Sequence, residues 1–515
     1  MRTQTTLKVI LISALYAAIF FFSSSKLYAQ HYPFPQHVKY HKHIKPSQYT
    51  QAELDEHVRS FYNTWKRIYL KNGCEINQYY VFFDSGNTLT VSEAMGYGMM
   101  ILPMMAGHDP GAKKYFDGLF RYFKAHPSSK TPHLMAWKQI TGCVNADGDD
   151  SASDGDIDIA FGLLLAHEQW GSTGDINYLY EAQLIIKDLM GNTAADGDIN
   201  QDIHTVILGD WVGPGSYMNS TRTSDFITDH FRLFACVSGD SLAWANVVDK
   251  CYDLISEMQT NYSKRTGLLP DFIVNIDKNA KPAKPDFLEG DLDGHYSYNA
   301  CRDPWRIGFD YLVNGDERAL NAVKKINSWL FQKTGGIPSQ IYAGYYLDGR
   351  AAANWHDVSF TAPFAVGAML DTTKQEWLNK LYDEVLSAKT SENGYYGNTL
   401  KLLSMLVISG NFRNPSCELY SGIKPRYAYS KIFKVYPTST KDKITIETTK
   451  DFTYSDVNIR IFNITGNVIK ELPLDSTGKT TLDLSFLPSG IYLVNLLNKK
   501  TGETATKKVI VNKWY

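Results

Sequence analysis

Six aspartates crowd into a short stretch that leads into an apolar helix. From Ser151 the chain reads S-A-S-D-G-D-I-D-I-A-F-G-L-L-L-A-H-E-Q-W-G, and residues 157–166 are apolar on nearly every side, as in a helix buried all round. One Ser or Asp at such a start commonly caps free backbone N–H groups, and acids in the first turn suit the helix dipole. Six like charges repel one another more than one cap requires, so we interpret this helix entrance as part of a site. The aspartates are Asp147, Asp149, Asp150, Asp154, Asp156 and Asp158.

Two further stretches carry acids where a helix begins. Glu93 stands three residues after Thr90, which is the spacing of a capping box, so one interpretation is that Glu93 only caps the start of the helix. Gly96 and Gly98 weaken the helix that follows by about 1 kcal/mol each relative to Ala, which favours close approach of another group to that backbone. Segment 285–306 mixes acids, glycines and aromatics without a period, as in an exposed functional loop that enters a helix near Asn299; a solvated acidic loop is the alternative.

Carboxyl groups on three helix entrances suggest hydrolysis of a glycosidic bond. That reaction needs one protonated carboxylic acid, which gives its proton to the leaving oxygen, and a second carboxylate that activates water or attacks the sugar. Acidic clusters on different helices can converge at one end of a ring of helices. A calcium loop fits poorly, because the sixth and twelfth places of the candidate loop hold Asp150 and Asp156 where Gly and Glu are needed.

The composition of the 515-residue chain is that of a globular protein with extra aromatic residues. Its length predicts two or three domains. Aromatic residues make up 13% of the chain, with 33 Tyr and 10 Trp; such rings stack on sugars, but a large aromatic core would contain them too. The formal net charge of −2 gives no basic field, which argues against nucleic acid or an anionic membrane as a partner.

Residues 1–29 have the pattern of a secretory signal peptide. Arg2 and Lys8 precede an apolar run over 9–22, which is short for a spanning helix, and the leader ends in a small residue, Ala29. No later stretch is long enough to cross a bilayer as a transmembrane segment. We therefore expect a soluble, exported mature protein.

The rest of the chain divides into regions of different pattern. Residues 30–50, rich in His, Pro and Lys, predict an extended lead-in, and we favour a solvated tail over a metal site at its histidines. Helical patterns over 51–414 predict one large all-helical domain, such as a ring of helical hairpins. After a linker at 415–429, alternating segments over 430–515 predict a small antiparallel β-sandwich with a structural or sorting role. The lead-in histidines considered are His37, His41 and His43.

The cysteines are widely spaced and lack metal-ligand spacing. In an exported chain an even number permits disulfides, but a large core makes them optional, and their connectivity cannot be read from the sequence. We favour small buried hydrophobic side chains at these positions. They are Cys74, Cys143, Cys236, Cys251, Cys301 and Cys417.

Three of the stretches described above resemble the signatures of glycoside hydrolase family 8. They are S-E-A-M-G-Y-G-M (92–99), A-S-D-G-D-I-D-I-A-F-G-L-L-L-A-H-E-Q-W (152–170) and N-A-C-R-D-P-W-R-I (299–307), and the resemblance covers about residues 51–410. It implies an (α/α)6 barrel, an inverting mechanism that needs no metal or other cofactor, and endo-type cleavage of β-1,4-linked polysaccharides.

The same resemblance implies roles for individual carboxylates. Glu93 corresponds to the general acid, and Asp154 to the central carboxylate that holds and distorts the sugar. In many members the general base is an Asp at the position where this chain has Asn299, and an amide cannot take a proton from water. In a subgroup with Asn there, which includes chitosanases and some β-glucanases, a Glu in the preceding loop is the base, and Glu289 fits. Its rivals in that loop are Asp291 and Asp293.

Other motif residues are expected to bind sugar or to form the cleft walls. Two more segments match the subgroup, T-S-D-F-I-T-D-H-F (223–231) and M-A-W-K (135–138). The expected substrate-binding residues are Tyr97, Trp137, Asp156, Asp225, Tyr298, Asn299, Arg302 and Trp305.

The C-terminal region resembles the sorting domain of the type IX secretion system. The resemblance rests on F-K-V-Y-P (433–437), L-P-S-G-I-Y-L-V (487–494) and a Lys-rich end. It implies the type IX secretion machinery as a partner, cleavage of the tail at the cell surface, and an enzyme that is secreted or attached to the cell envelope.

Together these patterns predict a secreted inverting endo-β-1,4-glycanase that hydrolyses β-glucan or chitosan. We expect Asp154 to raise the pKa of Glu93, so that this acid stays protonated near neutral pH. Polycationic chitosan would suit an acidic cleft, which the loop aspartates could supply, whereas neutral β-glucan needs mainly aromatic platforms. The loop aspartates are Asp147, Asp149, Asp286, Asp291 and Asp293.

A xylan-directed family 8 hydrolase, which cleaves within the chain or at its reducing end, is one alternative function. A non-catalytic glycan-binding protein on the same barrel, with Asn299 as the sign of a lost base, is another.

Overall fold

A computed structural model describes most of the chain after the leader. The described residues are 30–83, 85–191, 196–420, 433–448, 457–463, 468–475, 477–498 and 504–513. The expected signal peptide and most of the expected linker therefore lie outside the described residues. Within them, no helix is both long and apolar enough to span a bilayer.

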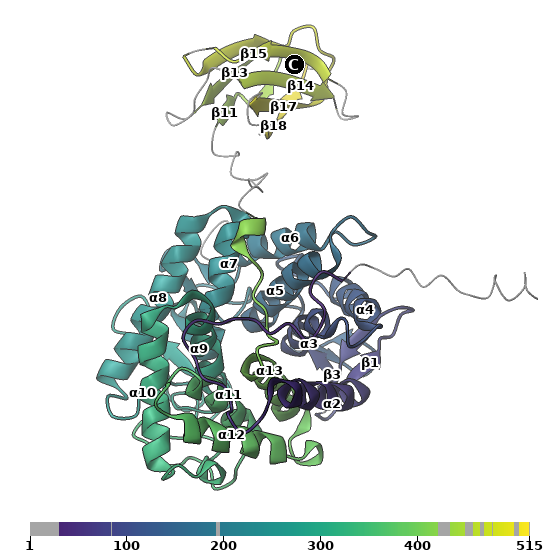
Figure 1. Ribbon diagram of the computed structural model, residues 1–515. Helices are drawn as coiled ribbons and strands as arrows, with labels where there is room; N and C mark the ends of the chain where they lie inside the picture. Colours follow the sequence, from purple (N-terminus) through teal and green to yellow (C-terminus); the bar gives the residue numbers. More distant parts are fainter. Residues whose placement is uncertain are drawn as a thin grey trace, which may run out of the picture.

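Helices alternate between an inner and an outer ring along the chain (Figure 1). Inner helices are apolar almost all round: every residue of α3 except Glu93 is buried, and so is every residue of α11. Outer helices bury one stripe only, as in α2, because their other face meets water. The inner helices are α3 (Ser92–Met105), α5 (Ser153–Trp170), α7 (Thr228–Ser238), α9 (Asp303–Asn314), α11 (Val358–Ala368) and α13 (Gly394–Ile408). The outer helices are α2 (Gln51–Tyr69), α4 (Ala112–Ala125), α6 (Tyr178–Met190), α8 (Ser241–Asn261), α10 (Glu317–Lys333) and α12 (Gln375–Ser387).

The expected helical barrel is thus present in outline, but the domain is not exclusively helical. Short strands fill the connections between helices and pair into small sheets. Each is two to four residues long, too short for the alternation that identifies a strand in a sequence. They are β1 (Leu70–Asn72), β2 (Tyr79–Val81), β3 (Thr88–Val91), β4 (Lys138–Ile140), β5 (Val144–Asn145), β6 (Ile199–Asn200), β7 (Thr205–Val206), β8 (Ser220–Arg222), β9 (Phe272–Val274) and β10 (Lys281–Pro282). Single 3-10 turns are η1 (Ser216–Asn219), η2 (Thr223–Asp225), η3 (Ala300–Arg302), η4 (Pro338–Gln340), η5 (Thr390–Glu392) and η6 (Cys417–Leu419).

The lead-in is extended, as expected, but it is not a solvated tail. Its backbone N–H groups donate to carbonyls at the C-terminal ends of five inner helices, α5, α3, α13, α9 and α11. Those carbonyls have no partner within their own helix, so the lead-in satisfies them. Phe34 and Tyr40 are buried in the same contact, and His37 Nε2 lies 2.7 Å from Asp55 Oδ2. In Figure 1 the lead-in crosses the ring in dark purple, so that end of the barrel is closed.

Four of the six cysteines form disulfides, so the expectation of six buried thiols is wrong for these four. Cys74 pairs with Cys143, and Cys236 pairs with Cys417. The partners are 69 and 181 residues apart, and only the fold brings them together. The expectation holds for the two free thiols, which are buried. These are Cys251 and Cys301.

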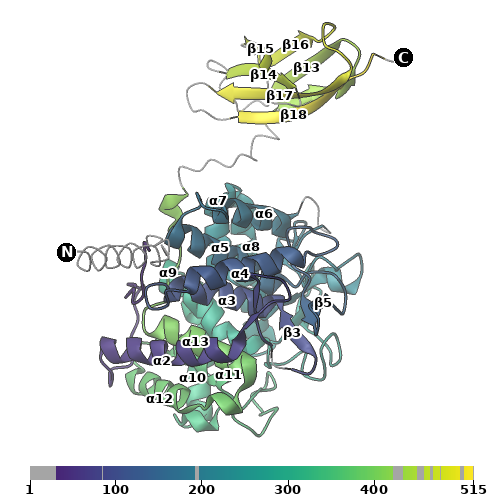
Figure 2. The same ribbon diagram turned by 90° about the vertical axis from the view of Figure 1, so that its right-hand side faces the viewer.

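The C-terminal strands form two sheets that bury one shared core (Figure 2). Inward side chains such as Ile446, Ile459 and Val494 come from both sheets. Most pairs are antiparallel, but β12 runs parallel to β18, so the unit is not purely antiparallel as expected. One sheet has the order β11 (Phe433–Tyr436), β13 (Lys443–Thr448), β16 (Lys479–Asp483). The other has the order β12 (Ser439–Thr440), β18 (Thr504–Val511), β17 (Gly490–Asn498), β14 (Val457–Asn463), β15 (Val468–Pro473).

Candidate active site

A cleft of about 540 Å³ opens where the inner helices begin, at the end opposite the lead-in. The first turns of α3 and α5 bring Glu93 and Asp154 to its wall, and η3 brings Arg302. The loop before η3 adds Glu289. The three acidic stretches that the sequence analysis singled out, which are far apart along the chain, therefore meet in one cleft.

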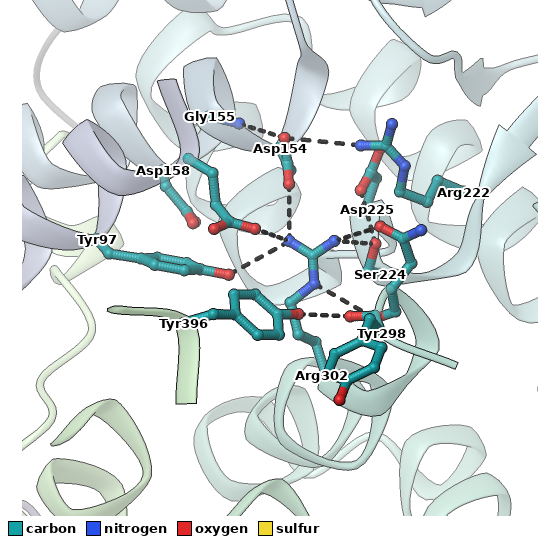
Figure 3. A network of polar contacts seen from close by, with 12 residues as sticks. Tyr97, Asp154, Gly155, Asp158, Arg222, Ser224, Asp225, Tyr298, Arg302 and Tyr396 are labelled. Atoms are coloured by element: carbon teal, nitrogen blue, oxygen red, sulfur yellow. Dashed lines mark hydrogen bonds and ion pairs between the residues drawn. The ribbon is translucent and has the colours of Figure 1, made fainter. Parts of the chain in front are cut away.

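The Arg302 guanidinium holds the two inner carboxylates, those of Glu93 and Asp154, together. Figure 3 shows its contact with Asp154. It is almost completely buried, and its Nη1 donates to Glu93 Oε2 at 2.8 Å and to Asp154 Oδ2 at 2.7 Å. Its Nη2 donates to Ser224 Oγ at 2.7 Å and to Asn299 Oδ1 at 3.1 Å. Charge-assisted bonds of this length fix position as well as charge, so Glu93 and Asp154 have little freedom to move.

Glu93 faces the cleft and does not cap its helix. The N-cap residue of α3 is Val91, which has no side-chain cap bond, and Glu93 Oε1 accepts a hydrogen bond from Tyr395 Oη at 3.2 Å. Burial raises the pKa of Glu93 to about 7; the Arg302 charge opposes this rise and the Asp154 charge adds to it. Asp154 thus acts in the expected direction, but burial is the larger cause.

Gly96 shows why α3 carries a glycine one turn below Glu93. A Cβ at this position would lie 2.7 Å from Asp158 Cβ and 3.0 Å from the Gly155 carbonyl oxygen. Only glycine lets α3 and α5 approach this closely, so the expectation of a close approach at this backbone is met. The tight contact sets the distance between the helix starts that carry Glu93 and Asp154.

Asn299 connects this inner group to Glu289. Its amide nitrogen donates to Glu289 Oε2 at 2.7 Å, while its oxygen accepts from Arg302. Hydrogen bonds therefore run from Glu93 through Arg302 and Asn299 to Glu289. Buried Asp271 accepts the backbone N–H of Ala300 at 2.7 Å and so holds the turn in which Asn299 lies.

Glu289 is the acid of its loop that reaches the cleft. Its side chain is 48% exposed, and Arg222 Nη2 lies 3.5 Å from its Oε1. Asp291 is exposed and outside the cleft wall. Asp293 is buried, and its carboxylate is occupied by three backbone N–H groups of the same loop. Of the three rival bases, Glu289 alone lines the cleft.

Of the eight expected substrate-binding residues, Trp137, Tyr298, Asn299 and Arg302 line the cleft, and four do not. Asp156 follows Asp154 by two residues, about 200° round the helix, and accepts the Met135 N–H at 2.8 Å behind the wall. The other three are buried one layer deeper. They are Tyr97, whose hydroxyl accepts from Arg302 at 3.3 Å, Asp225, which lies behind Arg222, and Trp305, whose ring packs on Arg306.

Several cleft residues were missed from the sequence. Arg222 stands one residue before the quoted 223–231 segment, and its Nη1 is 3.8 Å from Asp154 Oδ1. Tyr395 and Tyr396 begin α13 in a G-Y-Y-G stretch, and Asp357 caps α11. The only signal for the tyrosines was the general surplus of aromatic residues.

Among the described residues, no group of three or more His, Cys, Asp or Glu side chains is placed to hold a metal ion.

Comparisons with known proteins match both parts of the chain. The family model described as glycosyl hydrolases family 8 matches residues 59–410, and that of the secretion system C-terminal sorting domain matches residues 434–512. A beta-glucanase of Niallia circulans is 47% identical over 381 residues, 74% of this chain and 91% of the relative. An endoglucanase of Bacillus sp. (strain KSM-330) is 40% identical, over 74% of this chain and 82% of the relative. The solved apo structure of a beta-1,3-1,4-glucanase from Paenibacillus sp. X4 is 46% identical with a TM-score of 0.72, over 75% of this chain and all of that one.

Proposed function

Because the chain belongs to family 8 of the glycosyl hydrolases and is a glycoside hydrolase, we propose that it is an exported endo-β-glucanase with an inverting mechanism. Its proposed substrates are β-1,4-glucans and mixed β-1,3-1,4-glucans, the latter named in the description of the similar Paenibacillus structure. The observation that carries the proposal is the meeting of Glu93, Asp154 and Glu289 in one cleft.

In the proposed reaction, Glu93 gives its proton to the glycosidic oxygen while Glu289 takes a proton from the attacking water. Inverting enzymes hold these two carboxyl groups roughly 6.5–9.5 Å apart, which leaves room for that water. Here a guanidinium and an amide, those of Arg302 and Asn299, lie between them. Because the hydrogen bonds from Glu93 reach Glu289 only through these two side chains, the arrangement favours an activated water over direct attack by Glu289 on the sugar.

Asp154 supplies negative charge beside the sugar at the point of cleavage. The positive charge that develops on the sugar in the transition state is stabilised by a fixed carboxylate more than the neutral ground state is. Arg302 holds Asp154 Oδ2, and the Gly155 N–H donates to Oδ1 at 2.9 Å, so the carboxylate is already oriented. We propose that this carboxylate holds and distorts that sugar.

The charges on the cleft wall favour a neutral glucan over chitosan. Three of the four acids on the wall, Glu93, Asp154 and Glu289, face the guanidinium groups of Arg222 or Arg302, and a protonated Glu93 carries no charge. The fourth, Asp357, accepts hydrogen bonds from Tyr298 and Ser359. The loop aspartates that could have made an acidic cleft for a polycation are not on this wall. Aromatic rings on the wall that are available for stacking on sugars are those of Phe83, Trp137, Tyr298 and Tyr396.

Asn299 also favours an enzyme over a non-catalytic glycan-binding protein. A chain that had simply lost its base would leave the amide without a specific partner in the cleft. Instead the amide donates to Glu289, a carboxylate able to replace the missing Asp. We therefore propose a base that has moved to the loop.

A substrate panel tests this proposal. The purified protein should release reducing sugar from lichenan, barley β-glucan and carboxymethylcellulose at rates at least about tenfold above those on chitosan and xylan, because tenfold corresponds to only 1.4 kcal/mol of discrimination. Viscosity should fall early, as endo cleavage requires. Preference for xylan would support the xylan-directed alternative, and preference for chitosan would contradict the charge argument. Binding without product on all five would contradict the catalytic assignment.

The pH dependence follows from the proton on Glu93. A general acid works only while protonated, so kcat/KM should fall as the pH rises through about 7, the value to which burial raises the Glu93 pKa. Asp154 also faces Glu93 and raises its pKa, whereas Arg302, Arg306 and the Tyr395 hydrogen bond lower it. Tyr395→Phe removes the bond that lowers the pKa, so the basic limb should move to higher pH. A limb that stays in place in this variant would contradict the assignment.

The sorting domain over 434–512 marks the enzyme for export. We propose that residues 1–29 are a signal peptide, that 30–50 are the lead-in and that 51–414 are the catalytic domain. The linker at 415–429 and the tail at 430–515 would serve secretion. The tail would then engage the type IX secretion machinery and be removed at the cell surface. The Cys236–Cys417 disulfide supports a product that stays folded after cleavage, because it ties the start of the linker to α7 of the catalytic domain.

A further inference from the structure

The loop that presents Glu289 is organised by one carboxylate, that of Asp293. Asp293 Oδ2 accepts the backbone N–H of Leu288 at 2.7 Å and of Glu289 at 3.0 Å, and Oδ1 accepts the N–H of Gly290 at 3.0 Å. Three consecutive backbone donors therefore point at one side chain, which is only 3% exposed. The backbone of Glu289 itself is among the groups held.

Backbone contacts fix Asp293 in turn. Its N–H donates to the Gly290 carbonyl at 3.2 Å, which closes the turn, and its own carbonyl accepts the Phe272 N–H at 2.8 Å. Phe272 belongs to β9, so the turn is bonded directly to a strand. At the next residue, a Cβ on Gly294 would lie 2.1 Å from the Ala283 carbonyl oxygen, so only glycine lets the loop lie this close.

The loop also rests on a hydrophobic cluster separate from the core of the barrel. Phe287 packs with Phe272 and Tyr217, with ring centroids 5.7 and 5.1 Å apart, and Tyr217 Oη donates to the Phe287 carbonyl at 3.2 Å. The cluster is built on Ile207, Leu208, Val212, Phe272 and Ala283. Glu93 and Asp154 are placed by inner helices, whereas Glu289 depends on this cluster and on the Asp293 turn.

We propose that Asp293 is a positioning residue for the reaction: by gathering these N–H groups it holds the Glu289 carboxylate at the distance from the sugar that one water requires. The inference rests on the proposed role of Glu289 as the base. Glu289 needs such support because its side chain is half exposed, and its contact to Arg222 is long, at 3.5 Å, beside the 2.7 Å bond from Asn299. A displacement of about 1 Å can lower the rate by about 10²-fold.

The test compares Asp293→Asn and Asp293→Ala with Asp291→Asn, an exposed acid two residues away in the same loop. The Asn variant keeps one oxygen that can accept two of the three N–H groups, and the Ala variant keeps none. We expect kcat on lichenan to fall roughly threefold to tenfold in Asp293→Asn and about 10²-fold in Asp293→Ala, with KM changed less than about twofold. Asp291→Asn should match the wild type. Melting temperatures show whether each variant is folded.

A double variant separates positioning from general damage. Azide needs no base and should attack the sugar equally well in Glu289→Ala and in Glu289→Ala/Asp293→Ala. Equal azide-dependent rates in the two, together with the loss in Asp293→Ala alone, would support the inference. A further 10-fold loss in the double variant would overturn it, and so would full activity of Asp293→Ala. Full activity of Glu289→Ala would instead contradict the proposed function, so the two failures are distinguishable.

Discussion

Replacing Glu93 by Gln is expected to lower kcat on β-glucan by about 10²–10⁴-fold, the range that general acid catalysis supplies. The amide oxygen can still accept the hydrogen bond from Arg302, and the amide N–H can donate to the Tyr395 hydroxyl, so the fold and the cleft should survive. What is lost is the proton that burial keeps on Glu93 near pH 7. The measurements are kcat from reducing-sugar release, oligosaccharide affinity by calorimetry, and the melting temperature. Affinity and melting temperature should stay close to the wild-type values.

A substrate with a good leaving group tests the assigned role of Glu93 more sharply. An aryl oligoglucoside whose phenol has a low pKa needs little proton donation, so Glu93→Gln should lose far less activity on it than on the polymer. Equal losses on both substrates would show that the variant damages the cleft in another way. Full activity on the polymer would remove Glu93 from the mechanism.

The centre of the candidate site was predictable because its residues lie in long motifs at helix starts. Glu93, Asp154 and Arg302 each fall in the first turn of an inner helix or directly before it, and the first turns of the inner helices face the cleft. The helical period then explains the errors. Asp156 belongs to the same motif as Asp154 but stands two residues later, so it points behind the cleft wall. Tyr97 belongs to the same motif as Glu93 but stands four residues later, so it lies one helical turn deeper.

Residues that reach the cleft from loops were harder to predict. Arg222 is a single charge in a short strand, and Asp357 looks like any helix cap. Their partners lie far away along the chain, as Arg222 with Glu289 and Asp357 with Tyr298 show. The choice among the loop acids was likewise open in the sequence, since all three are acidic and close together. Only the fold shows that Asp293 turns inward to the backbone.

The closed end of the barrel was misjudged for a similar reason. The lead-in has no hydrophobic period, because it contacts a different helix every few residues and satisfies backbone carbonyls. Nothing in the composition of the lead-in distinguishes a segment packed on helix ends from a tail surrounded by water. The disulfides join residues across 69 and 181 positions, which spacing alone cannot pair. Long buried helices such as α5 were predictable because their apolar pattern is continuous.

Replacing Glu289 by Ala is expected to lower kcat by about 10²–10⁴-fold, the contribution of a general base. Asn299 cannot take over, because its amide has no basic oxygen and is already bonded to Arg302. Removal of Glu289 leaves the Asn299 N–H without its carboxylate partner, whereas Arg222 keeps Asp154 and Asp225 at 3.8 Å, so the cleft should still bind glucan. The kinetic constants on lichenan, at the pH optimum of the wild type, measure the effect.

Azide distinguishes a missing base from a damaged cleft. The anion needs no deprotonation, so it can replace the activated water in the space that Ala leaves, while Glu93 still protonates the leaving oxygen. Attack from the face opposite the leaving group turns a β-linkage into an α-glucosyl azide, which nuclear magnetic resonance identifies. Rescue of Glu289→Ala but not of Glu93→Gln on the polymer is the expected pattern, with Asp291→Asn as the active control. A β-azide product would contradict inversion, and rescue of neither variant would contradict the assignment of Glu289 as the base.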